Sequence, residues 1–507
     1  MNDNPYVKAW HFNHPPRPEQ TDILDFIQRS PQQVLAVDAP TGVGKSPVCI
    51  TLAVKDGGSI LTTQKILQDQ YMRDWPHIPL LKGAANYLCA EMKLEGSKEP
   101  NCDYGKKRHK CISCPYSDAR MKFLTANAGI TNYAYAMATA GTKFGVPKKK
   151  WLVLDEGHHV ENALISAAEV KISAAFCANA ISLPFEMPGN TGEAIAFATR
   201  VGALAKIRMG EIQAENDALA GSGTKIDLTK IRMFTELERL VGTIEIMMGD
   251  NDGEWIFGPF EKGTGFTIKP LMADGLFKNF ILPLGERIYI TSATLLRGEL
   301  MAKWLGIEPQ NFSFFAVDSP FPLAHRPLYY SPVAPMDYKN YGTSLPRIVS
   351  AIQKLMAHYH DKKGIIHTNS FKLSKDITML LKSQRILAHD ETNRDEMLQR
   401  HIHSPHPTVL VSPSMTEGVD LPGDLCRFTI FPKVPYASIG DAWTKERAKR
   451  DRKWYTWQAL KAVIQGCGRA VRNHEDHADA YMLDSCWDRF WPEAKALAPD
   501  WFRKSVN

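Results

Sequence analysis

The stretch "QVLAVDAPTGVGKS", residues 33–46, limits what the chain can fold into more than any other part of the sequence. An apolar run leads directly into a loop that contains Gly42 and Gly44, and a helix-like stretch follows the loop. In this strand–loop–helix order, the backbone N–H groups of the loop and the N-terminus of the helix surround phosphate oxygens. The stretch therefore predicts a phosphate-binding loop within an α/β domain whose strands lie parallel.

Lys45 and Ser46 end this loop with the two side chains that binding a nucleoside triphosphate requires. The lysine would reach the β- and γ-phosphates, and the serine hydroxyl would bind Mg²⁺. We therefore expect ATP and Mg²⁺ at this loop. The residues expected to surround the nucleotide here are Thr41, Gly42, Val43, Gly44, Lys45 and Ser46.

A second motif, "WLVLDEGHH" at residues 151–159, supplies two acids at the end of an apolar run. The side chains of Asp155 and Glu156 would emerge at the carboxyl edge of a parallel sheet, where α/β proteins bind ligands. We expect Asp155 to hold Mg²⁺ through its water shell and Glu156 to polarise the attacking water. A helix N-cap is the alternative interpretation of such a pair, but the upstream phosphate loop favours catalysis.

The segment "QGCGRAVRN", residues 465–473, offers two arginines near the end of the chain. Arg469 and Arg472 would share one face of a helix, because they are three residues apart. Hydrolysis of ATP needs positive charge at the γ-phosphate, so both are candidates for closing over it from a second domain. A surface salt-bridge pair is the alternative interpretation.

Two series of short apolar runs alternate with helix-like stretches, and a chain of 507 residues needs more than one core. Such runs predict two parallel sheets covered on both faces, with a boundary at 318–327. The segments 84–120 and 161–280 break the alternation, and we interpret both as insertions into the first α/β domain, the second one largely helical. The apolar runs are 33–40, 58–64, 128–135, 150–159 and 287–294, then 363–370, 408–415, 426–433 and 478–485.

The first insertion contains four cysteines separated by 12, 8 and 2 residues. Four thiolates suit either a tetrahedral Zn²⁺ or a [4Fe–4S] cluster. The spacing alone slightly favours zinc, because Cys-x₂-Cys is the more common zinc half-site. The expected ligands are Cys89, Cys102, Cys111 and Cys114.

Composition and charge restrict the cellular setting. Nine cysteines argue against a disulfide framework, and neither an apolar signal core nor a membrane-length apolar run is present. We expect a soluble protein of the cytoplasm, or of the host cytoplasm if it is viral, that has no membrane partner and acts as a monomer. A net charge of +6 is weak evidence for nucleic acid, and the basic runs 106–110 and 445–453 are most simply solvated surfaces.

Taken in order, these motifs resemble those of the XPD/DinG type of superfamily 2 helicases, which carry an iron–sulfur cluster. Ala39 replaces the first glycine of the general loop pattern, as in helicases, whereas Gly157 stands where this family usually has alanine. The matching segments are "RPEQ" (17–20), "APTGVGKS" (39–46), "TTQKILQDQ" (62–70), "DEGHH" (155–159), "TSATL" (291–295), "IIHTNS" (365–370), "SMTEGVDLPG" (414–423) and "QGCGRAVR" (465–472).

The resemblance implies two RecA-like motor domains that use ATP to translocate 5′→3′ on single-stranded DNA. It places an iron–sulfur domain and a mainly helical Arch domain where the two insertions lie, and it changes the expected metal from zinc to a [4Fe–4S] cluster. The implied domains are 1–83, 121–160 and 281–317 for the first motor domain, 84–120 for the cluster, 161–280 for the Arch and 318–507 for the second motor domain.

Further site residues follow from the same resemblance. Gln20 would contact adenine, and Asp420 and Gln465 would contact the nucleotide from the second motor domain. Thr63 and Gln64 would touch the DNA backbone. The cluster would fix a basic loop that meets DNA near the point of strand separation, through Lys106, Lys107, Arg108 and Lys110.

The predicted function is that of an ATP-dependent DNA helicase acting on single-stranded and forked DNA, with DNA repair among the expected roles. A DinG-like translocase that acts on RNA–DNA hybrids or protein-bound DNA is the enzymatic alternative. A scaffold with a decayed motor is the non-enzymatic alternative, and the presence of Lys45, Asp155, Glu156 and Arg469 argues against it.

Overall fold

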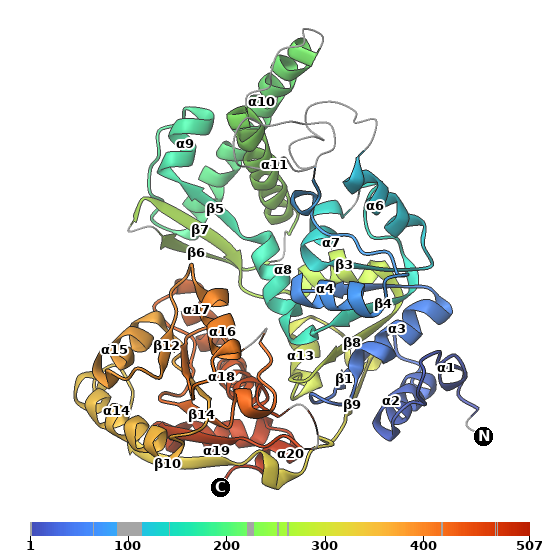
Figure 1. The fold of residues 1–507 in the computed structure, drawn as a ribbon. Helices are drawn as coiled ribbons and strands as arrows, with labels where there is room; N and C mark the ends of the chain where they lie inside the picture. Colours follow the sequence, from blue (N-terminus) through green and yellow to red (C-terminus); the bar gives the residue numbers. More distant parts are fainter. Residues whose placement is uncertain are drawn as a thin grey trace.

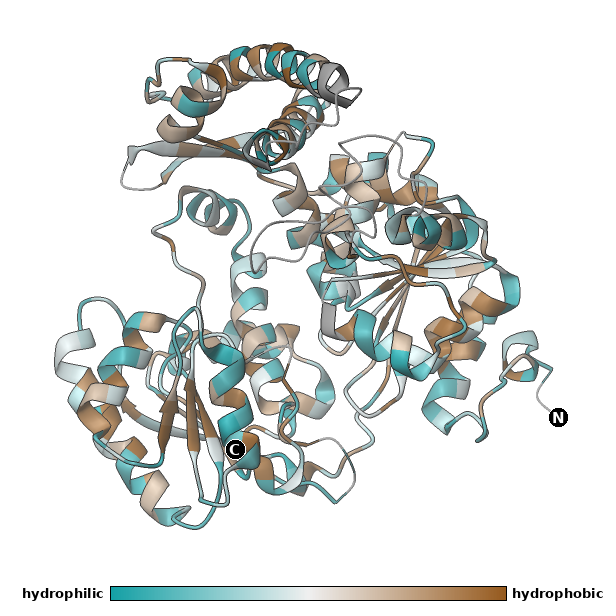
Figure 2. Cartoon of the chain, turned by 45° about the horizontal axis from the view of Figure 1, so that its top comes forward, coloured by the Kyte–Doolittle hydropathy of each residue, from teal (hydrophilic) through white to brown (hydrophobic). Residues whose placement is uncertain are grey.

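The structure, a computed structural model, describes residues 3–63, 65–88, 114–140, 142–220, 228–250, 253–260, 263–416, 419–471, 473 and 475–507. Its described residues form two six-stranded parallel sheets and one three-stranded antiparallel sheet (Figure 1). The α/β fold class with two RecA-like domains is therefore confirmed. Most strand residues of both parallel sheets are apolar and lie inside the molecule (Figure 2).

The first sheet has the strand order β3-β2-β4-β8-β1-β9 and is parallel throughout. Parallel strands end at the same edge, so the loop after β1 and the acids after β4 emerge on one side, separated by β8. The strands are β1 Val34–Asp38, β2 Gly58–Thr62, β3 Ala128–Asn132, β4 Lys149–Asp155, β8 Gly285–Ser292 and β9 Phe312–Ala316.

Helices cover both faces of this sheet. The helix after the phosphate loop begins behind Gly44, whose φ of 82° suits glycine, and it buries Val48, Ile50 and Leu52 in the core. The helices are α1 Pro5–Lys8, α2 Pro18–Arg29, α3 Lys45–Asp56, α4 Lys65–Asp74, α6 Pro115–Thr125, α7 Tyr133–Thr139 and α13 Gly298–Trp304.

The segment predicted to be largely helical also contains a sheet that the sequence pattern did not predict. Strands β5, β7 and β6 pair antiparallel in that order, and Phe266 of β7 packs against the rings of Phe185, Phe197 and Phe257. The elements are α8 Val160–Ala168, β5 Val170–Ser173, α9 Ala174–Ile181, α10 Thr191–Ala220, α11 Leu228–Gly249, β6 Trp255–Phe260, β7 Gly265–Pro270 and α12 Asp274–Leu276.

The second parallel sheet has the order β10-β15-β14-β11-β13-β12. Residues 505–507 run beside β10, where the backbone N–H of Leu328 donates to Ser505 at 2.7 Å. The strands are β10 Leu328–Ala334, β11 Gly364–His367, β12 Ile386–Ala388, β13 Val409–Ser412, β14 Phe428–Phe431 and β15 Asp479–Asp484. The helices are α14 Tyr341–His358, α15 Phe371–Leu381, α16 Arg394–His403, α17 Ala442–Arg450, α18 Arg452–Cys467, α19 Trp487–Leu497 and α20 Asp500–Arg503.

The basic run 445–453 is only partly the solvated surface that its composition predicts. Arg447 in α17 is fully buried, and its Nη2 donates to Glu161 of α8 at 2.9 Å. The other carboxylate oxygen of Glu161 accepts the indole N–H of Trp454 at 2.8 Å. The cause of this difference is tertiary, because the insertion brings an acid against one side of the run.

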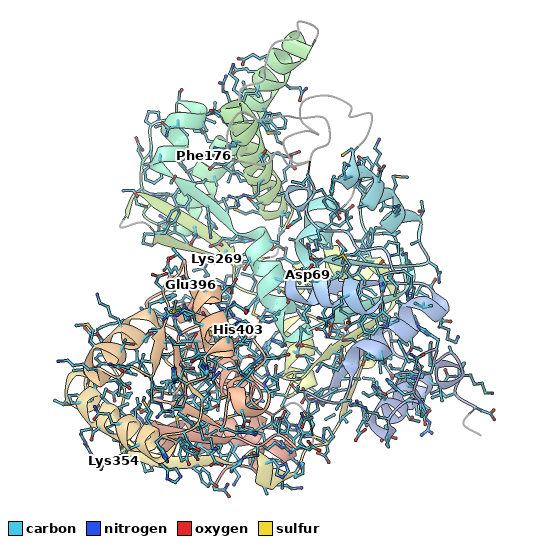
Figure 3. All side chains as sticks on the ribbon, viewed as in Figure 1. Asp69, Phe176, Lys269, Lys354, Glu396 and His403 are labelled. Carbon is cyan, nitrogen blue, oxygen red and sulfur yellow. The ribbon has the colours of Figure 1, made fainter. Side chains whose placement is uncertain are left out.

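Tryptophan N–H groups link the second motor domain to the rest of the chain at four points. Trp454 and Trp457 of α18 lie in the core. In Figure 3, Asp69 on α4 lies in the part with the first parallel sheet, Phe176 on α9 in the part with the antiparallel sheet, and Lys354 on α14 in the part with the second parallel sheet. The linking bonds run from Trp304 to Asp451, Trp443 to the carbonyl of Pro270, Trp454 to Glu161 and Trp457 to the carbonyl of Leu295.

Among the described helices, none has both the length and the apolar character that crossing a membrane requires.

Candidate nucleotide-binding site

A cavity of about 480 Å³ lies between the two parallel sheets and is lined by residues of both motor domains. It brings together residues that the sequence places more than 400 positions apart, such as Lys45 and Arg469. Val43 and Gln20 are buried beside the cavity but do not line it. The predicted residues that line it are Thr41, Gly42, Gly44, Lys45, Ser46, Asp155, Glu156, Asp420, Gln465 and Arg469.

The phosphate loop has the backbone shape that its glycines predict. Gly42 and Gly44 have φ values of 93° and 82°, in the left-handed region where a side chain is strained. The ring of Phe321 covers Gly42 so closely that a Cβ atom there would lie 2.2 Å from Cζ. The ammonium group of Lys45 donates to the carbonyl of Ala39 at 3.1 Å, which holds it within the loop.

Gln20 supports this loop from α2. Its Oε1 accepts the backbone N–H of Arg17 at 2.8 Å, and its Nε2 donates to the carbonyl of Gly44 at 2.9 Å. The guanidinium of Arg17 also donates to the carbonyl of Gly42. With 1% of its surface exposed, Gln20 acts here as a clamp on the loop, and its contact with adenine stays a prediction.

Asp155 lies at the end of β4 and is almost fully buried. Its Oδ2 accepts the hydroxyl of Tyr71 at 2.9 Å, and its Oδ1 accepts the backbone N–H of Glu156 at 3.0 Å. Burial, and after it the charge of Glu156, raises the pKa of Asp155 to about 6. Burial thus disfavours the ionised carboxylate, and a bound Mg²⁺ would favour it, because oxygen ligands of this ion are ionised carboxylates.

Glu156 has a left-handed backbone with φ of 50°, which is strained for a residue with a side chain and costs about 1–3 kcal/mol. Burial opposes its charged form, but the hydrogen bond from His158 and the charge of Lys45 outweigh burial and lower the pKa of Glu156. The carboxylate therefore remains an acceptor throughout the physiological range. Glu156 lines the same cavity as the phosphate loop.

A chain of hydrogen bonds connects Glu156 with the second motor domain. Ser292 donates to Glu156 Oε2 at 3.0 Å, and His158 Nδ1 lies 2.5 Å from the same serine hydroxyl. On the other side of the ring, Gln465 Nε2 donates to His158 Nε2 at 2.9 Å and to Thr294 at 3.3 Å. With Nε2 as the acceptor, the imidazole proton resides on Nδ1 and faces the serine and the carboxylate.

Arg469 approaches the cavity from the end of α18. Its Nε donates to the carbonyl of Gln465 at 3.2 Å, and its Nη1 donates to Val419 at 3.1 Å and lies 3.8 Å from Asp420 Oδ1. These backbone carbonyls hold the guanidinium in place before any phosphate arrives. The charge of the guanidinium also acts on His367, because burial, and after it the charge of Arg469, lowers the pKa of that imidazole to about 3.

Several predicted residues lie outside the described ones: Gln64, Cys89, Cys102, Lys106, Lys107, Arg108, Lys110, Cys111 and Arg472. Cys114 is described and is 8% exposed, and its sulfur accepts the backbone N–H of Ser117 at 3.4 Å at the start of α6. An N–H donor to sulfur also fits a thiolate ligand of a cluster. Within the described ranges, three or more His, Cys, Asp or Glu side chains do not converge as metal ligands. Thr63 is described at the carboxyl end of β2.

Sequence reasoning missed Tyr71, Arg326 and Trp501. Tyr71 contacts Asp155, while Arg326 and Trp501 line the cavity with Phe321. No local motif could have identified them, because the first lies on a helix face and the other two meet from segments 175 residues apart.

Comparison with known proteins gives relatives in sequence and in fold. Residues 352–505 match the helicase C-terminal domain family. The ATP-dependent DNA helicase YoaA of Haemophilus influenzae is 23% identical over 93% of this chain and 91% of its own length. The ATP-dependent DNA helicase CHL1 of Saccharomyces cerevisiae is 28% identical, but the match covers 19% of this chain and 13% of CHL1.

Solved structures agree along nearly the whole chain. An XPD helicase structure superposes with a TM-score of 0.65 at 17% identity, over 95% of this chain and 98% of that one. The structure of Xpd4 from S. tokodaii gives 0.60 at 13% identity, over 97% and 99%. These likenesses show the fold of the chain, with its two parallel sheets.

Proposed function

Because the chain is an XPD/DinG-like superfamily 2 helicase in its motifs and fold, we propose that it is an ATP-dependent DNA helicase that translocates 5′→3′. One observation carries the ATP-dependent part: a single cavity between two RecA-like domains contains the phosphate loop, both acids and Arg469. Its sequence relatives are named ATP-dependent DNA helicases, which supports DNA as the substrate. The 5′→3′ direction rests on the family resemblance.

In the proposed reaction, water attacks the γ-phosphorus of ATP and the bond to the β-phosphate oxygen breaks. Lys45 and the loop N–H groups bind the phosphates, while Glu156 orients the water and accepts its proton. Ser46 and Asp155 would hold Mg²⁺, which supplies charge neutralisation on the phosphates when bound. Arg469 stabilises the charge that develops on the leaving and transferred groups, together with Arg472.

Hydrolysis and domain movement are coupled in this proposal through Gln465. Its bond to His158 joins the second motor domain to the serine and glutamate at the γ-phosphate end. Movement of α18 breaks this bond and frees the imidazole to reorient. The orientation of Glu156 therefore depends on how closely the two domains approach.

The iron–sulfur domain remains part of the proposal. Cys89, Cys102, Cys111 and Cys114 would hold a [4Fe–4S] cluster that fixes the loop from 84 to 120. The basic side chains between the second and third ligands, together with Thr63 and Gln64, would contact single-stranded or forked DNA. The segment 161–280 would form the Arch.

Strand displacement on 5′-tailed, 3′-tailed and RNA–DNA hybrid substrates tests the proposal, with Lys45→Ala as the inactive control. We expect unwinding from the 5′ tail and none with the control. Unwinding only from a 3′ tail contradicts the direction, and full activity of Lys45→Ala contradicts the ATP assignment. Preference for the hybrid would favour the DinG-like translocase instead.

A further inference from the structure

Arg326 and Trp501 form a pair at the end of the cavity that no proposed step of hydrolysis uses. The guanidinium carbon of Arg326 lies 4.7 Å above the indole ring centroid of Trp501, and both side chains line the cavity. Arg326 belongs to the connection between the motor domains, and Trp501 belongs to α20. Backbone hydrogen bonds between Leu328 and residues 505 and 507 hold α20 at this place.

The sheet order assigns this pair to one end of the nucleotide. The two catalytic acids follow β4, which lies on one side of β1 beyond β8, whereas the connection that carries Arg326 follows β9 on the other side of β1. A nucleotide whose γ-phosphate faces Glu156 across the phosphate loop therefore extends its nucleoside towards β9. Phe321 connects the phosphate loop with Arg326, because its ring covers Gly42 and its carbonyl accepts two N–H groups of Arg326 at 3.1 and 3.3 Å.

Both members of the pair have a hydrogen-bond donor that nothing satisfies among the described residues. Arg326 Nη1 and Trp501 Nε1 are buried and have no hydrogen-bond partner. Leaving such donors unpaired is unfavourable, and more so for a charged group. Burial also lowers the pKa of Arg326 to about 10, although the charge of Asp318 acts in the opposite direction. The pair thus lacks acceptors that a ligand would supply.

We propose that Arg326 and Trp501 form the subsite for the nucleobase of the nucleoside triphosphate, an inference that rests on the proposed function. The planar guanidinium, supported from behind by the indole, offers a stacking face to the base, and the two unsatisfied donors meet acceptor nitrogens or oxygens of the nucleoside. Gln20 supports the loop from the other side, since its Nε2 donates to the carbonyl of Gly44 and its Oε1 accepts the N–H of Arg17 at the start of α2.

Competition binding with ADP and with inorganic pyrophosphate separates the base from the phosphates. The variants are Arg326→Ala and Trp501→Leu, and Arg503→Ala on the same helix is the matched control, because its side chain pairs with Asp500 and does not line the cavity. We expect each subsite variant to weaken ADP binding about tenfold or more, in the range for loss of base stacking, and to leave pyrophosphate binding unchanged. Discrimination among ADP, GDP, CDP and UDP should fall in parallel.

Two results overturn the subsite: equal weakening of ADP and pyrophosphate, or ADP binding as in the control. Thermal unfolding of each variant checks that the fold persists, and Trp501→Leu carries the test if Arg326→Ala does not fold. The proposed function fails separately, when Lys45→Ala still hydrolyses ATP, whereas the ratio of ADP to pyrophosphate affinity still reports on the subsite.

Discussion

The buried pair between Glu161 and Arg447 gives a sharp prediction about how the second motor domain is held. The side chain of Arg447 is 0% exposed and that of Glu161 is 8% exposed, and their closest atoms are 2.9 Å apart. Burial raises the pKa of Glu161 even though the charge of Arg447 acts to lower it. Desolvation therefore outweighs the attraction, so the pair holds specific groups in place without adding much free energy.

This balance fixes the expected magnitudes. Glu161→Gln removes the carboxylate that pairs with a buried guanidinium and should cost about 3–5 kcal/mol. Adding Arg447→Met removes that charge, while the glutamine oxygen still accepts the indole N–H of Trp454. The double variant should therefore return to within about 1–2 kcal/mol of the parent chain, since apolar replacement of a buried pair is often neutral.

Thermal unfolding monitored by circular dichroism and by fluorescence measures both variants. For a cooperative unit of 150–250 residues, 1 kcal/mol corresponds to about 2–4 °C, so Glu161→Gln should lower Tm by about 6–20 °C. Arg452→Ala, which breaks an exposed pair with Glu493, is the matched control and should change Tm little. A drop of less than about 2 °C for Glu161→Gln, or a double variant as unstable as the single one, would refute the reasoning.

Three further predictions concern the site and the core around it. Gly157→Ala places a Cβ 2.2 Å from Ile290 Cγ2 and should lower the free energy of unfolding by about 1–3 kcal/mol, as measured in denaturant. Adding Ile290→Leu, which lacks that methyl group, should recover most of this loss. If the double variant recovers nothing, the steric cause is wrong. Gln465→Ala should lower the DNA-stimulated kcat at least tenfold with KM for ATP within about threefold in steady-state ATPase assays, and an unchanged kcat would remove the coupling role. Burial lowers the pKa of His367 to about 3 and that of His401 to about 4, so the fold favours neutral rings. Their contribution to the free energy of unfolding is complete above about pH 6.5 and is lost as the pH falls, by about 1.4 kcal/mol per pH unit for each ring. His367→Gln should therefore make the free energy of unfolding depend less steeply on pH in urea titrations from about pH 6.5 to 4.5. An unchanged dependence on pH would contradict this prediction.

Central strands were predictable because they are buried on both faces and therefore continuously apolar. All nine predicted runs overlap a strand, for example β1 within 33–40 and β14 within 426–433. The missed strands of the parallel sheets include β9 and β12, which lie at sheet edges and are short or half-buried. β12 has 3 residues, which is too short for a clear apolar pattern, and no residue of β9 is fully buried.

The site residues that belong to a local sequence motif were predictable. The site residues that only the tertiary fold brings together were not. The loop around Lys45 and the acids after β4 depend on backbone shape and strand ends, which neighbouring residues determine. The pairing of Arg326 with Trp501 depends on backbone bonds between β10 and the last residues of the chain. Likewise Arg447 is buried because an insertion nearly 290 positions away supplies Glu161.

The four tryptophan N–H bonds between the second motor domain and the rest of the chain give the protein an internal optical reporter. An indole that exchanges a carboxylate or carbonyl acceptor for water changes the wavelength and intensity of its emission. Trp304, Trp443, Trp454 and Trp457 would all make that exchange if the domains separated. Opening and closing during turnover can therefore be followed in rapid mixing without an attached dye.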